Sequence, residues 1–285
     1  MNGSSSILRS RMSIILLFFI TTLPSLHGQS MWTVGQTRKE VSVEFLSLGF
    51  NSDNFIDDMS GYSMYITGRL PFGEHNAFML MLPYAHGEYP TYTTWLFTVN
   101  GQNHSTIGNV YLGVELVKPE TGMTTNIGLF LPTIDKEKWT AIISGLFSDI
   151  DRYESYIPEF VSIAFRTGKH FNPDGGLGLR LRAGITGMLN TASQSNGGDS
   201  FEAMMVYAAQ PTITAGAVQI VAGFSGRMML TDGADLEDRV LHQAGIAGTV
   251  TLGPVRFGAY YRLPINDMLK TFMKSSVGGN VTLTF

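Results

Sequence analysis

Apolar and polar residues alternate in many short stretches of this chain. The last stretch, Ser275 to Phe285, shows the pattern clearly. From Val277 onward every second residue is valine, glycine, leucine or phenylalanine, and the residues between are glycine, asparagine and threonine. Side chains alternate across a β-strand, so this stretch predicts a strand with one apolar face and one small polar face.

Twelve stretches of this kind are predicted strands, and most of them have one apolar face. Their ranges are 39–50, 61–70, 75–84, 107–117, 122–132, 158–166, 175–188, 201–209, 213–230, 239–252, 255–263 and 275–285. Residues 75–84 are apolar on both faces, so the pattern leaves open which face of that strand is the outer one.

The connections between the predicted strands alternate in length. Those after even-numbered strands are mostly short, as at 118–121 and at a turn expected over 210–212, and the others are longer, including a loop expected over 86–106. Outer-membrane β-barrels have short periplasmic turns, longer outer loops and usually an even strand count. The fold class predicted is therefore all-β, a transmembrane antiparallel up-and-down barrel of twelve strands with both termini in the periplasm. A soluble periplasmic β-protein is the alternative, but a sandwich has no reason to alternate its connections in this way.

The longest connection is expected over 133–156. Its middle, 136–147, is a predicted helix with apolar side chains on one side, namely Trp139, Ile142, Ile143 and Leu146. Such a face is able to fold into the barrel and constrict its mouth.

The amino terminus has the pattern of a secretory signal peptide. Arg9 and Arg11 precede an apolar core at 13–23, and small residues follow up to Gly28. This core is too short to span a membrane. We expect residues 1–28 to be removed and 29–285 to form the barrel; an uncleaved anchor helix is the alternative.

Composition narrows the classes of function. The chain has no cysteine, so disulfides and cysteine-bound metals are excluded. Removal of the signal peptide would leave 17 basic and 23 acidic residues. The sequence has no basic patch that would indicate a nucleic-acid partner. An exported chain without disulfides needs another source of stability, and a closed barrel with every backbone pair made supplies it.

Charged residues gather on the predicted inner faces of the strands. An arginine facing lipid at mid-membrane costs about 2–4 kcal/mol, so these side chains are expected in the lumen. The inward candidates are Arg69, Arg166, Arg180, Arg182, Arg227, Arg256 and Arg262, with Glu44 and Glu115. One interpretation is an electropositive lumen that favours anionic solutes. The other is an internal ion-pair network with these glutamates or with loop acids that rigidifies the barrel.

The sequence gives little support for catalysis. The histidines follow no metal-binding spacing, and no Ser–His spacing on one strand face sets up a nucleophile and a base. We therefore expect no catalytic residue, no metal and no cofactor. A lipid-modifying outer-membrane enzyme remains the alternative to a passive channel, as does a structural barrel without transport.

The closing strand resembles the last strand of bacterial outer-membrane barrels, which end in phenylalanine after alternating apolar residues. Here these residues are Val281, Leu283 and Phe285. The resemblance implies that the barrel-assembly machinery of a Gram-negative bacterium reads this strand as a signal.

Short motifs in residues 60–135 resemble a known transporter family. They are R-L-P-F-G at 69–73, L-P-Y at 82–84, I-G-N-V-Y-L-G at 107–113 and L-F-L-P-T at 129–133. They are similar to motifs of the outer-membrane transporter family named for the meta-pathway of phenol degradation, although Asn109 and Ile134 stand where that family has Asp and Gly. The resemblance implies a channel for small, often hydrophobic compounds in the outer membrane, with the lipid bilayer and a small solute as partners.

Overall fold

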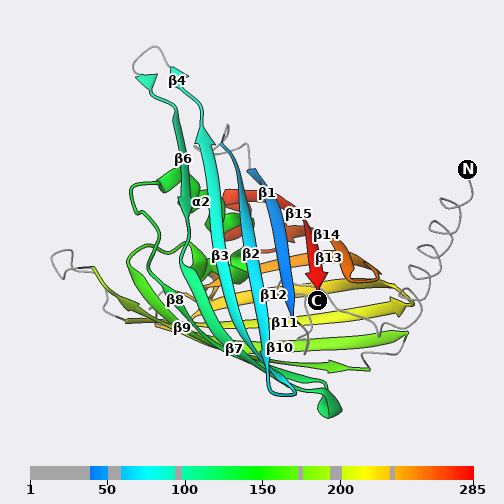
Figure 1. The fold of residues 1–285 in the computed structure, drawn as a ribbon. Coiled ribbons are helices and arrows are strands. Elements are labelled where there is room, and N and C mark those ends of the chain that lie inside the picture. Colours follow the sequence, from blue (N-terminus) through cyan, green and yellow to red (C-terminus); the bar gives the residue numbers. More distant parts are fainter. Residues whose placement is uncertain (1–38, 51–58, 94–97, 173–175, 193–200, 232–234) are drawn as a thin grey trace, which may run out of the picture.

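The structure is a closed antiparallel β-barrel of twelve strands (Figure 1). The computed structural model describes residues 39–50, 59–93, 98–172, 176–192, 201–231 and 235–285. The predicted signal peptide lies outside these ranges, as do large parts of the loops expected around 51–60, 190–200 and 231–238. Among the described residues, no helix is long and apolar enough to cross a membrane.

Each barrel strand pairs with the next one in the chain. The first half consists of β1 (Glu40–Phe50), β2 (Ser60–Phe72), β3 (Asn76–Tyr89), β6 (Gln102–Ile107) continued by β7 (Val110–Lys118), β8 (Met123–Leu131) and β9 (Phe160–Phe171). The second half consists of β10 (Leu177–Asn190), β11 (Phe201–Ala215), β12 (Val218–Met229), β13 (Val240–Leu252), β14 (Val255–Pro264) and β15 (Met273–Thr284). β1 and β15 pair from Glu40↔Thr284 to Phe50↔Met273 and close the barrel.

The alternating lengths of the connections are confirmed. At one end of the barrel the strands are joined by tight turns, such as 216–217 and 253–254; we call this the turn end. The opposite end, which we call the loop end, has the longer connections, including α4 (Asp267–Phe272) and the segment that follows β8. By the rule for outer-membrane barrels, we expect the turn end to face the periplasm.

The outer face of the barrel is a continuous apolar belt. Exposed side chains alternate along each strand, for example Leu177, Leu179, Leu181 and Ile185 on β10. The strand that was ambiguous in sequence presents Phe78, Leu80 and Leu82 outward. Large exposed apolar side chains on every strand fit lipid and not water.

Two sequence predictions about connections are wrong. The expected turn at 210–212 lies inside β11, where Pro211 lacks an N–H and the ladder with β12 is interrupted between Ala209↔Phe224 and Thr212↔Val221 before it resumes. Much of the loop expected over 86–106 is strand, because β3 pairs with β6 out to Tyr89↔Gln102. A short hairpin, β4 (Tyr92–Thr93) and β5 (Thr98–Val99), lies beyond it.

The apolar belt predicts a large cost for a charge at its centre. Ile185 is 48% exposed on the lipid face of β10. Replacing it with arginine should lower the free energy of unfolding by about 2–4 kcal/mol, measured by denaturant titration in lipid vesicles. Ile185→Ala is the matched control and should cost clearly less. Equal stability of the two variants would mean that this face does not contact lipid.

Candidate functional site

The connection between β8 and β9 folds into the barrel. It contains α2 (Trp139–Ser148) followed by the 3-10 helix η2 (Ile150–Ser155), and we call residues 132–159 the plug. α2 packs against β1, β2, β3 and β6, and η2 reaches β12 on the other side of the barrel. Figure 1 shows these helices within the ring of strands. The predicted helix at 136–147 is thus present with slightly shifted ends.

α2 contacts the wall through small residues. A Cβ placed on Gly61 would lie 2.0 Å from Ser144 Oγ, and one placed on Gly87 would lie 2.1 Å from the carbonyl oxygen of Thr140. Thr140 Oγ1 also donates to the Gly87 carbonyl at 2.9 Å. The glycines therefore allow the helix backbone to approach the strands closely.

The end of α2 is tied to two strands. Ser148 and Ser63 share a hydrogen bond of 2.6 Å between their Oγ atoms, and Ser276 Oγ donates to the Ser148 carbonyl at 2.8 Å. Of the apolar residues expected to face the lumen, Ile142 is buried and Ile143 and Leu146 are half-buried, but Trp139 is exposed. The tightest contacts of the helix come instead from Thr140, Ser144 and Ser148, which are buried.

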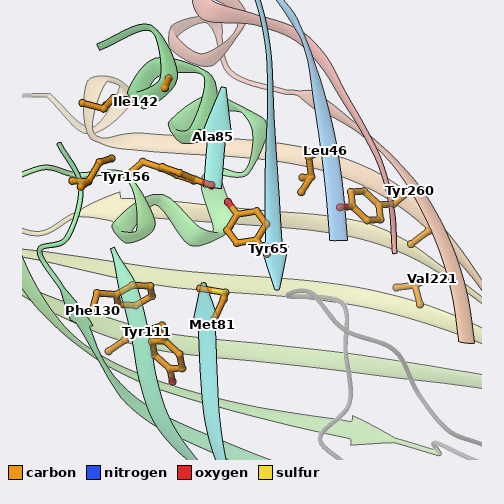
Figure 2. Packing of buried hydrophobic residues seen from close by; sticks show 14 residues of the cluster. Leu46, Tyr65, Met81, Ala85, Tyr111, Phe130, Ile142, Tyr156, Val221 and Tyr260 are labelled. Carbon is orange, nitrogen blue, oxygen red and sulfur yellow. The ribbon is translucent and has the colours of Figure 1, made fainter. Parts of the chain in front are cut away.

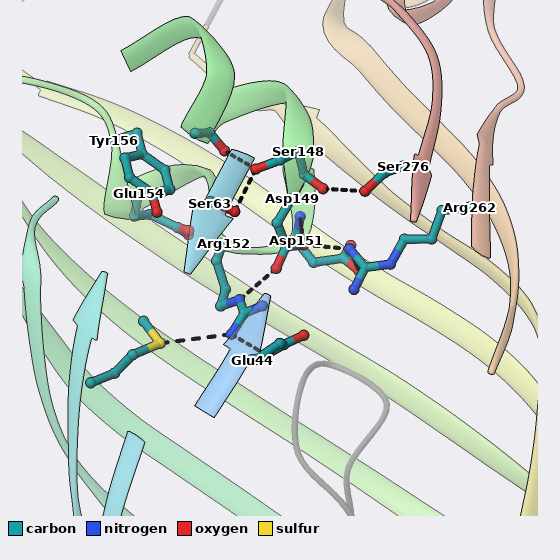
Figure 3. Close-up of polar contacts among 12 residues, drawn as sticks. Glu44, Ser63, Ser148, Asp149, Asp151, Arg152, Glu154, Tyr156, Arg262 and Ser276 are labelled. Carbon is teal, nitrogen blue, oxygen red and sulfur yellow. Dashed lines mark hydrogen bonds and ion pairs between the residues drawn. The ribbon is translucent and has the colours of Figure 1, made fainter. Parts of the chain in front are cut away.

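Buried ion pairs hold η2 at the middle of the lumen (Figure 3). Asp149 accepts from Arg152 at 2.5 Å and from Arg262 of β14 at 2.6 Å. Arg152 also pairs with Glu44 of β1 at 2.8 Å, and its guanidinium lies 3.4 Å from the centre of the Tyr65 ring.

Glu154 is held by two further wall arginines. Its carboxylate pairs with Arg227 of β12 at 2.6 Å and with Arg166 of β9 at 3.1 Å, and it accepts from Thr186 Oγ1 at 2.7 Å. Neighbouring Asp151 accepts from Ser225 Oγ at 2.9 Å. The plug therefore supplies carboxylates to arginines on three different strands.

The pKa values of the plug carboxyls follow from these contacts. Burial alone would raise the pKa of Glu154, but Arg227 and Arg166 lower it from 4.5 to about 2. Burial likewise opposes the charged form of Asp149, and Arg152 with Arg262 lowers its pKa from 3.8 to about 2. Both groups are charged at neutral pH.

The other predicted lumen residues also lie on the inner face. Glu115 pairs with Arg69, and Arg256 pairs with Glu40 at 3.4 Å. Arg180 donates to Gln219 Oε1 at 2.7 Å near the turn end, and Arg182 is half-buried two residues further along β10. Of the predicted assembly residues, Phe285 is 68% exposed beside the closing seam, where its backbone N–H donates to the Lys39 carbonyl at 2.9 Å.

The root of the plug is built from the short motifs seen in the sequence. Strand β6/β7 is interrupted at Gly108 and Asn109; the Gly108 N–H donates to the Pro83 carbonyl at 2.9 Å, and Thr133 Oγ1 donates to the Gly108 carbonyl at 2.6 Å. Tyr156 Oη donates to the Tyr84 carbonyl at 3.0 Å. Motif segments from three parts of the chain thus meet where the plug enters.

Asn109 is the centre of this root. Its Nδ2 donates to the carbonyls of Glu154 and Ile157 at 2.9 and 2.6 Å, and its Oδ1 accepts from the Ile134 N–H at 3.3 Å. An ionised aspartate has no hydrogen to donate to those carbonyls. The departure from the family motif at this position therefore matches the contacts that this chain makes.

Apolar side chains fill the lumen around the plug. Figure 2 shows Tyr65 beside Tyr156, with ring centres 6.0 Å apart, and Tyr111 beside Phe130 further down. A second cluster lies towards the loop end and is formed by Leu48, Phe50, Met59, Tyr89, Ile150, Leu269 and Met273. These contacts occupy the loop half of the lumen.

A cavity of about 180 Å³ lies on the turn side of the plug. Arg152 and Phe130 line it next to the plug, and Gly122 and His170 line it near the turns. The structure therefore has a lumen that is filled in one half and hollow in the other.

The sequence indicated loop acids only in one of two interpretations of the inward arginines, and it did not identify which acids these are. Asp149, Asp151, Arg152 and Glu154 lie in the long connection, where no periodic pattern marks them as buried. A signal was present nonetheless, because seven inward arginines faced only two predicted glutamates. Such an imbalance requires acids from elsewhere or an anionic solute.

One Ser–His pair lies on the outer face of the barrel. Ser105 and His86 are cross-strand neighbours near the loop end, and their Oγ and Nδ1 atoms are 3.0 Å apart. Among the described residues, no carboxylate is hydrogen-bonded to His86, and no group of three or more histidine, aspartate or glutamate side chains is placed to hold a metal ion.

The sequence matches no protein-family model, and it has no match among curated proteins. Solved outer-membrane barrels share the fold. An outer membrane channel of Pseudomonas putida F1 has a TM-score of 0.58 at 7% identity over 88% of this chain and 97% of that one. The β domain of the Bordetella autotransporter BrkA has a TM-score of 0.54 at 12% identity, over 88% of this chain and all (100%) of that one. LpxR of Salmonella typhimurium has a TM-score of 0.50 at 10% identity, over 86% and 100%.

These likenesses show the fold. Together with the apolar belt, they define the chain as a β-barrel protein of the bacterial outer membrane.

The low pKa values of Glu154 and Asp149 predict that acid loosens the plug. Their folded-state pKa values lie below the ordinary ones, so their stabilising effect is complete above about pH 5 and is lost as the pH falls towards about 2. Trp139 of α2 reports this when Trp32 and Trp95 are replaced by phenylalanine. Its fluorescence should stay constant between about pH 8 and pH 5 and shift reversibly below about pH 4.

The double variant Asp149→Asn, Glu154→Gln is the control and should lack this acid step. A step centred near neutral pH would contradict the assignment to these two carboxylates.

Proposed function

We propose that this protein is a passive outer-membrane channel for small compounds and that the plug closes it in this conformation. The observation that carries the proposal is the half-filled lumen. Eight-stranded barrels are filled by their own side chains, and sixteen-stranded ones enclose open channels. Here the wall leaves a cavity on the turn side, and a separate segment, not the wall, fills the loop side.

The chain is proposed to belong to the transporter family named for the meta-pathway of phenol degradation. What supports this is the position of the shared motifs: the segments 82–84, 107–113 and 129–133 converge on the root of the plug. In this proposal the role of the motifs is to hold the gating segment in place. The solute class on this basis is small and hydrophobic or anionic.

Folding of the barrel is proposed to require the closing strand as a recognition signal for the assembly machinery. Val281, Leu283 and Phe285 all point outward in β15 or beside it, so their side chains lie on the outer surface of the barrel. This outward alternation, which ends in an aromatic residue, supports the proposal.

A structural barrel without transport is the second candidate. In that case the ion pairs hold the plug in the lumen permanently and stiffen the barrel, and we call such a plug a brace. The two differ in what happens when the network is weakened. A brace has no open state, whereas a plug that leaves the lumen gives a conducting barrel.

Weakening the network should therefore raise conductance. The unmodified protein is expected to give small or no current in planar bilayers, with anion preference where a current is seen. Asp149→Asn with Glu154→Gln removes both carboxylates that bind the wall arginines and should increase the open fraction by at least about tenfold, since breaking a buried pair costs about 3–5 kcal/mol.

Glu115→Gln is the matched control. It breaks the Arg69–Glu115 pair, which joins two wall residues and leaves the plug untouched. A large, cation-selective current in the unmodified protein would overturn the proposed lumen. An unfolded double variant with no current would favour the brace.

A lipid-modifying enzyme is a distinct alternative, because Ser105 and His86 form a hydrogen-bonded pair on the outer face of the barrel. Without a carboxylate to orient His86 we expect no turnover of phospholipid or lipopolysaccharide, with or without divalent cation. Acyl release that Ser105→Ala abolishes would reverse this expectation.

A further inference from the structure

The cavity on the turn side of the plug has two chemically different walls. One wall is apolar and consists of Met79, Met81, Tyr111 and Phe130, with the two rings 4.8 Å apart. The other is formed by strands β9 and β10 and carries Arg166, Arg180 and Arg182. A ligand that satisfies both walls has a flat apolar body and an anionic group.

Glycines shape the basic wall. Arg182 faces Gly168 across the β9–β10 ladder, and Arg166 faces Gly184. A Cβ on Gly168 would lie 3.0 Å from Arg182 Cγ, and one on Gly184 would lie 2.8 Å from Arg166 Cγ. The arginine stems therefore lie flat over glycines, which keeps the cavity open beside them.

The cavity has an excess of positive charge. Its lining includes the arginines 152, 166, 180 and 182 but only two carboxylates, Glu44 and Glu115. Arg152 is committed to Glu44 and Asp149, Arg166 to Glu154, and Glu115 to Arg69. Lys169 also lines the cavity, so the basic side chains of the lining outnumber its carboxylates by five to two. Arg180 donates to Gln219 of β12, which lies two strands away in the same wall.

We propose that this cavity binds a small organic monoanion with a flat apolar body, such as an aryl sulfonate or aryl carboxylate, which enters from the turn end. The anionic group lies against Arg180 and Arg182, and the ring lies against Tyr111, Phe130 and the methionines. Guanidinium groups bind planar oxyanions in a bidentate manner, and methionine adapts to varied apolar shapes. This inference rests on the proposed function, because it assigns the solute that the channel holds beneath its closed plug.

Three probes separate the two walls: benzenesulfonate, benzenesulfonamide and methanesulfonate. Benzenesulfonate is ionised throughout the useful pH range, benzenesulfonamide is a neutral analogue of similar shape, and methanesulfonate lacks the ring. Titration calorimetry with the protein in lipid nanodiscs should give one site for benzenesulfonate. The other two probes should bind at least about tenfold more weakly.

Variants assign the site. Arg180→Gln with Arg182→Gln should weaken benzenesulfonate by at least about tenfold, and Arg182→Gln alone should weaken it measurably if the double variant does not fold. Arg256→Gln is the matched control, because this inward arginine does not line the cavity; it should change affinity by less than about twofold.

Equal affinity for benzenesulfonate and benzenesulfonamide, or affinity unchanged in Arg182→Gln, would overturn the assignment. Binding in nanodiscs combined with no current from any plug variant would leave the site standing and refute the channel. Current without saturable binding of benzenesulfonate would support the channel and refute the binding site.

Discussion

The structure depends on two buried carboxylates, Asp149 and Glu154, at the centre of the barrel. Removing a charge from water costs several kcal/mol unless a partner and hydrogen bonds replace its hydration. Each carboxylate has two arginines, and the wall arginines come from β9, β12 and β14. The dependence is mutual, since the same arginines would otherwise need water in the lumen. Docking of the plug therefore satisfies the carboxylates and the wall arginines at the same time.

Glycines give this arrangement its shape. Where the plug helix meets the wall, Gly61 and Gly87 allow close approach, and where arginines and tyrosines cross to a neighbouring strand, glycines lie beneath them. Tyr111, for example, lies over Gly113 and Gly128. Tyr111 and the stems of Arg166 and Arg182 therefore lie along the wall. This is why twelve strands that carry many large inward residues still enclose a cavity.

The barrel could be predicted from the sequence because side chains alternate between the two faces of a strand, and one of these faces contacts lipid while the other faces the lumen. Lipid requires an apolar residue at every second position, so Leu177, Leu179 and Leu181 mark their own orientation, and the charges at Arg180 and Arg182 must face inward. Outside the membrane this constraint disappears, which is why no alternation around Tyr89 and Gln102 marks these residues as paired strands. Pro211 indicated a turn from local chemistry alone, but pairing on both sides of β11 overrides it.

The plug could be predicted only in outline. A helical pattern and an excess of inward arginines were visible, but the partners are far apart: Asp149 and Arg262 are separated by 113 positions, and Ser148 and Ser276 by 128. No local pattern specifies such pairs. The polar face of α2 also had no sequence signal, because Thr140, Ser144 and Ser148 read as an exposed face until the glycines opposite them are known.

The most direct test of a docked plug is a reversible cross-link between Ser148 of α2 and Ser63 of β2. Their Oγ atoms are 2.6 Å apart, and the chain has no cysteine of its own. In the variant Ser63→Cys, Ser148→Cys, a disulfide should form in membranes under mild oxidation. The oxidised protein should then stay closed at about pH 3, and reduction should restore the acid-induced current. Failure to cross-link, or equal acid-induced current in the oxidised and reduced forms, would contradict the account.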